Sequence, residues 1–283
     1  MATASIIIPT YNDNQQLERC LRALEQQDFA RNDYEVIVVN NNPENPTPKV
    51  SDKIIVIDES KPGSYAARNK GLEIAKGDYI FFTDSDCIPG SDWISSALSF
   101  FSRQNVDRIA GHVSLFYSSS SPSIYEKLDY VTAFNQKNNA QNGVSVTANL
   151  IVRKEVFEKV GNFNAKLLSG GDIEWNKRAT KAGYSIVYNP NTSVSHPARG
   201  SLQELKSKMR RVAGGKVSNG NLKLLRAIKI SLSSWDNIRS ISKSKELNFS
   251  DKIKCILIVQ LLKFYGTLCG LLILLNLSSP QRK

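Results

Sequence analysis

Two aspartates, Asp84 and Asp86, stand one residue apart directly after an apolar run. The run, YIFF at residues 79–82, has the composition of a buried strand, and the segment TDSD follows it at once. Two carboxylates at the end of such a strand repel one another and lose hydration, so a positive group between them is expected. Hard cations such as Mg²⁺ and Mn²⁺ bind oxygen ligands and share them with phosphate groups. The pair predicts a divalent metal site or, because Asp and Ser are common in turns, a plain turn.

A third aspartate, Asp172, follows two glycines in GGDIEW, where a helix is predicted to begin. A carboxylate within hydrogen-bond reach of a hydroxyl group can take its proton, and the glycines let the backbone bend sharply. The alternative is an N-cap, for which Asn or Ser would serve equally well. Both interpretations stay open from the residues alone, and Glu174 is the second candidate for the base.

Three further side chains are of a type that could take part in chemistry. His196 ends the strand-like run TSVSH, and an imidazole nitrogen there could complete a metal shell beside Asp86 or act as a structural hydrogen-bonding group. His112 is expected to be structural. Trp175 could offer a flat face to a ligand or fill the core.

Short continuous apolar runs alternate with helical patterns in the first half of the chain. Continuous runs suit strands that are covered on both faces, and helices between them suit parallel crossovers. The sequence therefore predicts an α/β fold with an open, mostly parallel sheet flanked by helices. The carboxyl ends of parallel strands meet at one edge of a sheet, which is where ligands bind. We expect three polar segments at that edge, residues 10–12, 40–42 and 83–86.

The composition is that of an ordinary folded protein. The chain has 283 residues, of which 41% are hydrophobic and 22% are charged, and one large domain with an appendage fits this length. The four cysteines have no zinc-ligand spacing, and the first apolar run is typical of a strand rather than a signal peptide. We expect reduced thiols and a cytoplasmic location.

The positive charge is concentrated in the last third of the chain. Residues 1–200 hold 21 Lys and Arg against 22 Asp and Glu, whereas residues 201–283 hold 16 against 4. Residues 206–229 contain eight basic side chains and no acidic one. An anionic partner is therefore expected there. No aromatic interleaving or recognised module accompanies the charge, so nucleic acid is not the expected partner.

The apolar segment 255–277 lies next to this charge and has Lys263 as its single charged residue. Its uninterrupted part, residues 264–277, is 14 residues long, which is shorter than the ~20 that a spanning helix needs. A buried helix and a helix that pairs with another subunit are the alternatives to membrane attachment. Because basic residues flank the segment, we expect peripheral or monotopic attachment to an anionic membrane surface, at the cytoplasmic face.

Five motifs occur in an order that resembles the family 2 glycosyltransferases of the GT-A fold, over about residues 4–202. They are SIIIPTYN, AARNKG, TDSDCIPGSDWI, GGDIEWNKRATKAGY and VSHPARGS. The resemblance implies a nucleoside diphosphate sugar donor, a divalent metal, Mn²⁺ or Mg²⁺, on the Asp-x-Asp motif, and transfer with inversion.

The resemblance also implies roles for individual residues. Thr10 and Tyr11 would line the nucleobase and ribose pocket, and Arg68 would reach the base or the diphosphate. Asp84 would contact the ribose. The remaining roles are metal ligation by Asp86 and His196, and base catalysis by Asp172.

The chain departs from the family pattern at Asn40 and Asn41, where many relatives have an acidic pair that recognises the base. Asn donates and accepts hydrogen bonds, so Asn41 could meet a uracil or a guanine edge. A UDP-sugar is favoured as the donor, and a GDP-sugar is possible.

The expected function is metal-dependent, inverting transfer of a sugar to an acceptor hydroxyl in cell-envelope or polysaccharide glycan synthesis. The acceptor is a glycan or a lipid-linked molecule, with Trp175 and Glu174 as candidate contacts. The expected domains are residues 1–202, with a nucleotide-binding half (1–110) and an acceptor half (111–202), and a basic helical tail (203–283). The alternative is a non-catalytic module that binds a sugar nucleotide or glycan and scaffolds a partner through its C-terminal helix.

Overall fold

The computed structural model describes residues 2–47, 51, 53–218 and 235–280. The chain divides into two compact units. The first unit comprises residues 1–114, 134–165 and 171–196, and the second comprises 115–133, 166–170 and 197–283. The predicted boundary after residue 202 lies close to the last of these divisions. The segments 115–133 and 166–170, however, join the second unit rather than the first.

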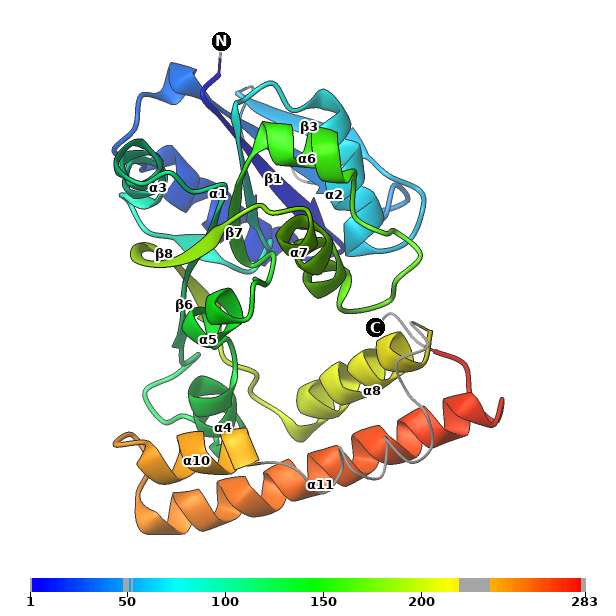
Figure 1. Ribbon diagram of the computed structural model, residues 1–283. Helices are drawn as coiled ribbons and strands as arrows, with labels where there is room; N and C mark the ends of the chain where they lie inside the picture. Colours follow the sequence, from blue (N-terminus) through cyan, green and yellow to red (C-terminus); the bar gives the residue numbers. More distant parts are fainter. Residues whose placement is uncertain (1, 48–50, 52, 219–234, 281–283) are drawn as a thin grey trace. The chain divides into compact units, whose positions relative to one another are not determined.

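The chain contains an eight-stranded sheet with the strand order β3-β2-β1-β4-β7-β6-β8-β5 (Figure 1). The strands are β1 (Ala4–Thr10), β2 (Tyr34–Asn40), β3 (Ile54–Asp58), β4 (Tyr79–Thr83), β5 (Ile88–Pro89), β6 (Arg108–Phe116), β7 (Asn149–Arg153) and β8 (Ile186–Pro197). The helices of the first unit are α1 (Asn14–Glu25), the 3-10 helix Arg31–Asp33, α2 (Ser64–Ile74), α3 (Trp93–Arg103), α5 (Gln136–Gln141), α6 (Lys154–Val160) and α7 (Gly171–Lys181).

One half of the sheet is parallel and the other is antiparallel. Strand β1 pairs in parallel with β2 and β4, and β2 pairs in parallel with β3. Strand β7 is antiparallel to β4 and β6, and β5 is antiparallel to β8. The predicted α/β class, with flanking helices and a C-terminal helical extension, is confirmed. The antiparallel half departs from the prediction of a mostly parallel sheet.

The parallel strands bury both of their faces, as continuous apolar runs require. Ile6 and Ile8 of β1 pack with α1 and α3 on one face of the sheet. Ile7 between them packs with α2, α6 and α7 on the other face. Figure 1 shows these two groups of helices on opposite sides of the sheet. The parallel strands therefore lie between two apolar layers.

Arg108 of β6 is fully buried and ties the antiparallel half to helix α7. Its guanidinium donates to Asn176 O at 3.0 Å and Oδ1 at 2.7 Å, to Thr180 Oγ1 at 2.9 Å, to Tyr184 O at 2.7 Å and to Ser185 O at 3.3 Å. Burial lowers the pKa of Arg108 to about 10. Arg108→Met is expected to lower the free energy of unfolding by about 3–5 kcal/mol, because it leaves several buried acceptors unpaired. Urea denaturation followed by circular dichroism measures this loss.

Arg103→Met is the matched control for this change. Arg103 is exposed at the end of α3 and donates one hydrogen bond, to Ser99 O at 3.1 Å. Arg103→Met is expected to change the free energy of unfolding by less than about 0.5 kcal/mol. Equal stability losses in the two variants would show that the network around Arg108 contributes no more than a surface arginine does.

The second unit is helical. Its helices are α4 (Ile124–Thr132), α8 (Leu202–Ser218), α10 (Trp235–Lys243) and α11 (Phe249–Leu274). Ser123 starts α4 with a capping box, in which its hydroxyl accepts from Glu126 N, and Asn248 caps α11 by accepting from Asp251 N. The core of this unit consists of Leu128, Leu205, Ile241, Leu247, Cys255, Val259 and Leu262. Of the predicted basic run, Lys223, Arg226 and Lys229 lie outside the described residues.

Helix α11 contains most of the predicted apolar segment and is 26 residues long, with a mean hydropathy of 2.0 over its most apolar window. Among the described helices it alone has the length and composition to cross a membrane. Its other feature is an exposed apolar face. We call this face the exposed stripe; it consists of Phe249, Ile253, Leu257, Leu261, Phe264 and Leu268. The spacing of three or four residues places the stripe on one side of the helix.

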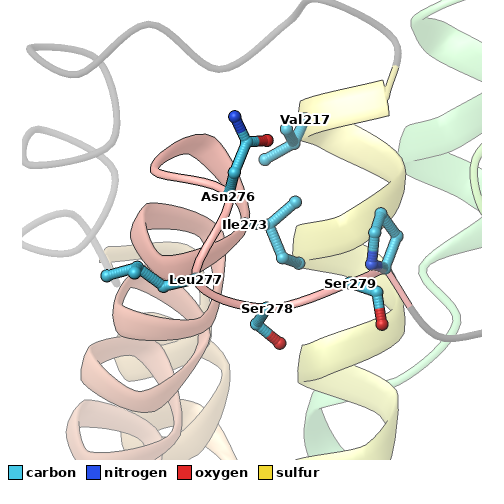
Figure 2. A pocket seen from close by; sticks show the side chains of 7 residues that line it. Val217, Ile273, Asn276, Leu277, Ser278 and Ser279 are labelled. Carbon is cyan, nitrogen blue, oxygen red and sulfur yellow. The ribbon is translucent and has the colours of Figure 1, made fainter.

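A hollow of about 500 Å³ lies at the C-terminal ends of α8 and α11 (Figure 2). Val217 and Ile273 contribute its apolar side, and the chain from Asn276 to Pro280 contributes the rest. The described residues that line it are all uncharged, so they offer neither a cation for an anionic ligand nor a carboxylate for a metal.

Candidate active site

Polar side chains converge at the carboxyl edge of the parallel strands. Thr10 and Asn40 end β1 and β2 and are direct partners in the parallel register. Strand β4 runs parallel on the other side of β1, so Asp84, which follows it, emerges at the same edge. The sequence-based prediction of such an edge agrees with this strand arrangement.

Arg68 and Asp84 form the best-buried ion pair at this edge. Arg68 lies on α2 with 3% of its surface exposed, and its Nη2 donates to the Asp84 carboxylate. Among the described residues, Arg68 Nε and Thr10 Oγ1 are buried without a hydrogen-bond partner. An unpaired buried polar group costs about 1–3 kcal/mol. Arg68 and Thr10 are two of the residues that the sequence-based prediction assigned to donor binding.

Asp86 and His196 meet beside this pair. His196 Nε2 lies 3.3 Å from Asp86 Oδ2, and the His196 side chain is 6% exposed. The Phe134 ring packs 5.0 Å from the imidazole, centroid to centroid, and helps to fix its orientation. Two ligands of one octahedral cation, each about 2.1 Å from it, lie about 3 Å apart. The oxygen and nitrogen of this pair therefore fit a single divalent cation.

The described residues contain no group of three or more His, Cys, Asp and Glu side chains placed to hold a metal. A cation on Asp86 and His196 would therefore take its remaining ligands from phosphate oxygens and water. Mg²⁺ commonly binds in this way, through one or two carboxylates and the phosphates of a substrate.

Asp172 is the second residue of α7 and lies against Tyr65 of α2. Tyr65 Oη donates to Asp172 Oδ1 at 3.2 Å, and Ile173 N donates to the same oxygen at 2.9 Å. Gly171 permits this approach, since a Cβ there would lie 2.7 Å from the Tyr65 ring. Gly170 has a φ of +76°, which favours glycine. The backbone geometry around the Asp172 carboxylate therefore explains why glycine occupies both positions.

Burial raises the pKa of Asp172, while the N–H of Ile173, the charge of Arg68 and the Tyr65 hydroxyl oppose the shift. Burial and the negative charge of Asp172 also raise the pKa of Tyr65. Tyr65 therefore stays protonated and keeps donating to the carboxylate. Asp172 is a stronger base than an exposed aspartate would be.

Asn41 has a positioning role. Its Nδ2 donates to Glu59 O and Lys61 O, each at 2.8 Å, and its Oδ1 accepts from Gly63 N at 2.6 Å. Both donor hydrogens are therefore taken by the backbone, and only the oxygen has capacity left for a donor molecule. Tyr11, at the end of β1, is 43% exposed, so its ring is accessible to a ligand.

The predicted acceptor contact of Trp175 is wrong. Trp175 is fully buried, stacks on Phe157 at 4.2 Å between ring centroids, and donates from Nε1 to Gly161 O. It is a core residue beneath α7. Glu174 pairs with Arg178 through two hydrogen bonds of 2.7 and 3.2 Å, as an i,i+4 ion pair on the same helix.

Sequence reasoning missed Tyr65. The available signal was its spacing, because residues three apart on a helix share a face and Tyr65 precedes Arg68 by three positions. The Arg68 guanidinium lies 5.7 Å from the centroid of the Tyr65 ring. Tyr65 thus links the Arg68–Asp84 pair to Asp172.

Comparison with known proteins places these features in a family. Residues 5–161 match the model of "Glycosyl transferase family 2". The chain is 36% identical over 222 residues to "Glycosyltransferase AglE" of Haloferax volcanii, with 75% of this chain and 72% of the relative covered. It is 23% identical over 221 residues to a dolichyl N-acetyl-alpha-D-glucosaminyl phosphate 3-beta-D-2,3-diacetamido-2,3-dideoxy-beta-D-glucuronosyltransferase of Methanococcus voltae, with 71% of this chain and 68% of that relative covered.

Solved structures agree in fold. A mannosyltransferase, PcManGT of Pyrobaculum calidifontis, in complex with GDP-Man and Mn²⁺, has a TM-score of 0.63 at 17% identity, covering 95% of this chain and 87% of that one. S. aureus TarS 1-349 in complex with UDP has a TM-score of 0.53 at 17% identity, covering 98% and 92%. The family match spans more than half of the chain, and a relative above 30% identity is matched over most of its length. The chain therefore belongs to glycosyl transferase family 2 and is a glycosyltransferase.

Proposed function

We propose that this glycosyltransferase moves a sugar from a nucleoside diphosphate sugar to an acceptor hydroxyl, with inversion and with a divalent cation, in glycan synthesis. The observation that carries the proposal is the arrangement at one sheet edge. It consists of two pairs, Arg68 with Asp84 and Asp86 with His196, and of Asp172 at the start of α7.

Asp86 and His196 would hold the cation, Mn²⁺ or Mg²⁺, together with oxygens of the diphosphate. When bound, the cation neutralises the charge of the leaving diphosphate. Asp84 orients the buried Arg68 guanidinium. Arg68 Nε and Thr10 Oγ1 would then bond to the donor, with Asp84 on its ribose and Tyr11 on its base.

Asp172 would act as the base. The acceptor oxygen bonds to the anomeric carbon as the bond from that carbon to the diphosphate breaks, and the hydroxyl proton moves to Asp172. A single displacement of this kind inverts the anomeric configuration. Tyr65 and the N–H of Ile173 fix the carboxylate, so the base is already oriented before the acceptor arrives.

The donor is proposed to be a UDP-sugar, with a GDP-sugar as the alternative. Complexes of structural neighbours contain GDP-Man, UDP and UDP-GlcNAc. Asn40 and Asn41 are both engaged with neighbouring groups, Asn40 through Asp58 at 3.0 Å. Neither side chain carries a negative charge, so neither can select one nucleobase in the way that an acidic side chain would.

Calorimetric titration with UDP, GDP, dTDP and CDP, each with and without Mn²⁺, tests the proposal. Binding of one nucleotide that depends on the metal is the expected result, followed by transfer or hydrolysis of the matching nucleotide sugar. If folded protein binds none of the four, the catalytic proposal fails and a non-catalytic scaffold becomes the better interpretation.

Attachment of helix α11 to the cytoplasmic face of a membrane is also proposed. The side of the helix that carries Cys255, Val259 and Leu262 is buried in the second unit. The opposite side carries the exposed stripe, with Leu257 64% and Phe264 67% exposed. The surrounding third of the chain has a large excess of basic residues. A helix with one face in protein and the other apolar suits attachment in the plane of an anionic bilayer.

Leu257→Glu combined with Phe264→Glu is expected to release the protein from vesicles of mixed anionic and neutral lipid. Each exposed apolar side chain gains about 1.5–3 kcal/mol on burial in the bilayer, so the partition coefficient should fall by more than about tenfold. Co-sedimentation with the vesicles measures it. Ser250→Glu combined with Ser279→Glu adds the same charge at exposed polar positions. Equal release of both double variants from the vesicles would show that the added negative charge alone causes the release, and would refute insertion of the exposed stripe.

A further inference from the structure

A bulky residue ahead of α5, Phe134, has a strained backbone. Its φ is +40°, in the left-handed region that favours glycine. Among the described residues, the other non-glycine residues with a positive φ are Asn12 and Asn276. Asparagine tolerates this conformation, whereas a bulky side chain in it is an outlier. The backbone therefore does not explain why the chain has Phe at this position, because Asn or Gly would adopt the conformation more easily.

The residues that follow Phe134 hold its backbone in place. Asn135 caps α5, because its Oδ1 accepts from Asn138 N at 3.1 Å. Gln136, the first residue of α5, is buried, and its Nε2 donates to Ser145 Oγ at 2.8 Å. A strained conformation persists where the surrounding structure fixes it in this way, and such residues cluster at functional sites.

The ring of Phe134 packs against the imidazole of His196, with an angle of 56° between the two planes. The same ring is partly buried against the apolar core that contains Ile6 and Ile8. His196 is buried, and its Nε2 lies close to the Asp86 carboxylate. Phe134, His196 and Asp86 all belong to the first unit. The strained residue therefore contacts one of the two side chains that are proposed to hold the cation.

Strand pairing brings His196 to Asp86 but does not orient the imidazole. Ser195 of β8 pairs with Ile88 of β5, so the residue after Ser195 lies near the segment that leads into β5. The imidazole can still turn about its two side-chain torsions, and only some of its rotamers direct Nε2 at the Asp86 carboxylate. A ring packed against the imidazole excludes the other rotamers. Groups that fix the orientation of a ligand raise the affinity for the metal.

We propose that Phe134 is a positioning residue for the metal site. Its ring holds the His196 imidazole with Nε2 toward Asp86, so that both ligands are arranged before the cation binds. The strained backbone is the cost of placing an aromatic ring at this point. The inference rests on the proposed function, which assigns the cation to Asp86 and His196.

Phe134→Asn is expected to weaken Mn²⁺ binding at least about threefold, because the imidazole then turns freely. Mn²⁺ is titrated into the full-length protein alone, with UDP and with GDP, and its paramagnetic resonance signal reports the free ion. Phe134→Tyr keeps the ring and should keep the wild-type affinity. Loss of affinity in Phe134→Tyr equal to that in Phe134→Asn would show that the ring is not the group that matters.

Phe29→Asn is the matched control. Phe29 lies in the loop between α1 and the 3-10 helix, is partly buried and packs against the same apolar core as Phe134. Its ring lies 6.5 Å from that of Tyr34, at the amino end of β2 and so away from the carboxyl edge. The control should keep the wild-type Mn²⁺ affinity. Equal weakening by Phe29→Asn and Phe134→Asn would show a general loss of core packing and overturn the proposal.

A double-mutant cycle with His196→Ala tests whether Phe134 acts through the imidazole. Phe134→Asn should weaken Mn²⁺ binding no further once the imidazole is absent. A further loss of the same size as in the wild-type background would overturn the proposal.

The same titrations separate failure of this inference from failure of the proposed function. If the wild-type protein binds no Mn²⁺, or if His196→Ala binds it as tightly as the wild type, the proposed metal site fails and the role of Phe134 with it. If His196→Ala weakens Mn²⁺ binding and Phe134→Asn does not, the metal site stands and only the role of Phe134 is refuted.

Discussion

Asp172→Asn is expected to lower kcat for sugar transfer by about 10²- to 10⁴-fold while nucleotide affinity stays unchanged. The amide has nearly the same shape as the carboxylate, and its oxygen can still accept from Ile173 N and Tyr65 Oη, which now hold the carboxylate. It cannot take the proton of the acceptor hydroxyl. Initial rates at saturating donor measure the loss of kcat. Calorimetric titration with the nucleotide that the wild-type protein binds measures the affinity.

The pH profile of the wild-type enzyme provides a second readout of the same base. Burial raises the pKa of Asp172 above that of an exposed aspartate. A base works only when it is deprotonated, so kcat should rise with pH through this raised pKa and level off above it. The rise should be absent from the residual activity of Asp172→Asn.

Glu174→Gln is the matched control, because Glu174 is on the same helix two residues further on. It loses the ion pair with Arg178, which is worth about 0.3–0.5 kcal/mol in a helix, and should keep kcat within a few-fold. A large loss in this variant with full activity in Asp172→Asn would transfer the role of the base to Glu174.

The parallel half of the fold was predictable because its signal is local. Each strand from β1 to β4 is a continuous apolar run with polar residues at its carboxyl end, and the parallel pairing brings those ends together. Thr10, Asn40 and Asp84 therefore follow from strand order alone. The antiparallel half has no such signal, because β8 contains no continuous apolar run over most of its 12 positions and pairs with β5, a segment far away in the sequence.

The side chains beside Asp172 were harder to predict. Trp175 is the kind of residue that contacts an acceptor sugar. The orientation of α7 instead points it into the core, where it packs against Phe157. Tyr65 has no motif of its own, yet its hydroxyl reaches Asp172, 107 positions later. The spacing from Arg68 marks Tyr65 itself, but neither the Trp175–Phe157 contact nor the Tyr65–Asp172 contact is encoded in local spacing.

Local sequence patterns also could not predict which segments make up the second unit. Leu128 of α4 packs with Leu205 of α8 and Cys255 of α11, so the segment 115–133 belongs with residues far along the chain. Hydropathy located the apolar segment of α11 correctly. It could not separate the buried side of this helix from the exposed stripe, because both are apolar.

Asp86→Ala is the second change with a large expected effect. It should remove the part of nucleotide affinity that depends on Mn²⁺, a decrease of at least about tenfold, because one imidazole and water hold a hard cation poorly without a carboxylate. Nucleotide binding without metal should stay the same, since Arg68, Asp84 and Thr10 are unchanged. Calorimetry with and without Mn²⁺ gives both values, and the paramagnetic resonance signal of free Mn²⁺ gives metal binding directly.

Asp92→Ala is the control for this change, as it removes an exposed carboxylate at the start of α3. It should retain the full response to Mn²⁺. His196→Ala should lose an intermediate share of that response, since the imidazole lies 3.3 Å from the Asp86 carboxylate and would supply the second protein ligand. A full response to Mn²⁺ in Asp86→Ala would place the metal elsewhere. In that case the Asp86–His196 contact would act only as a structural link between β8 and the segment that follows β4.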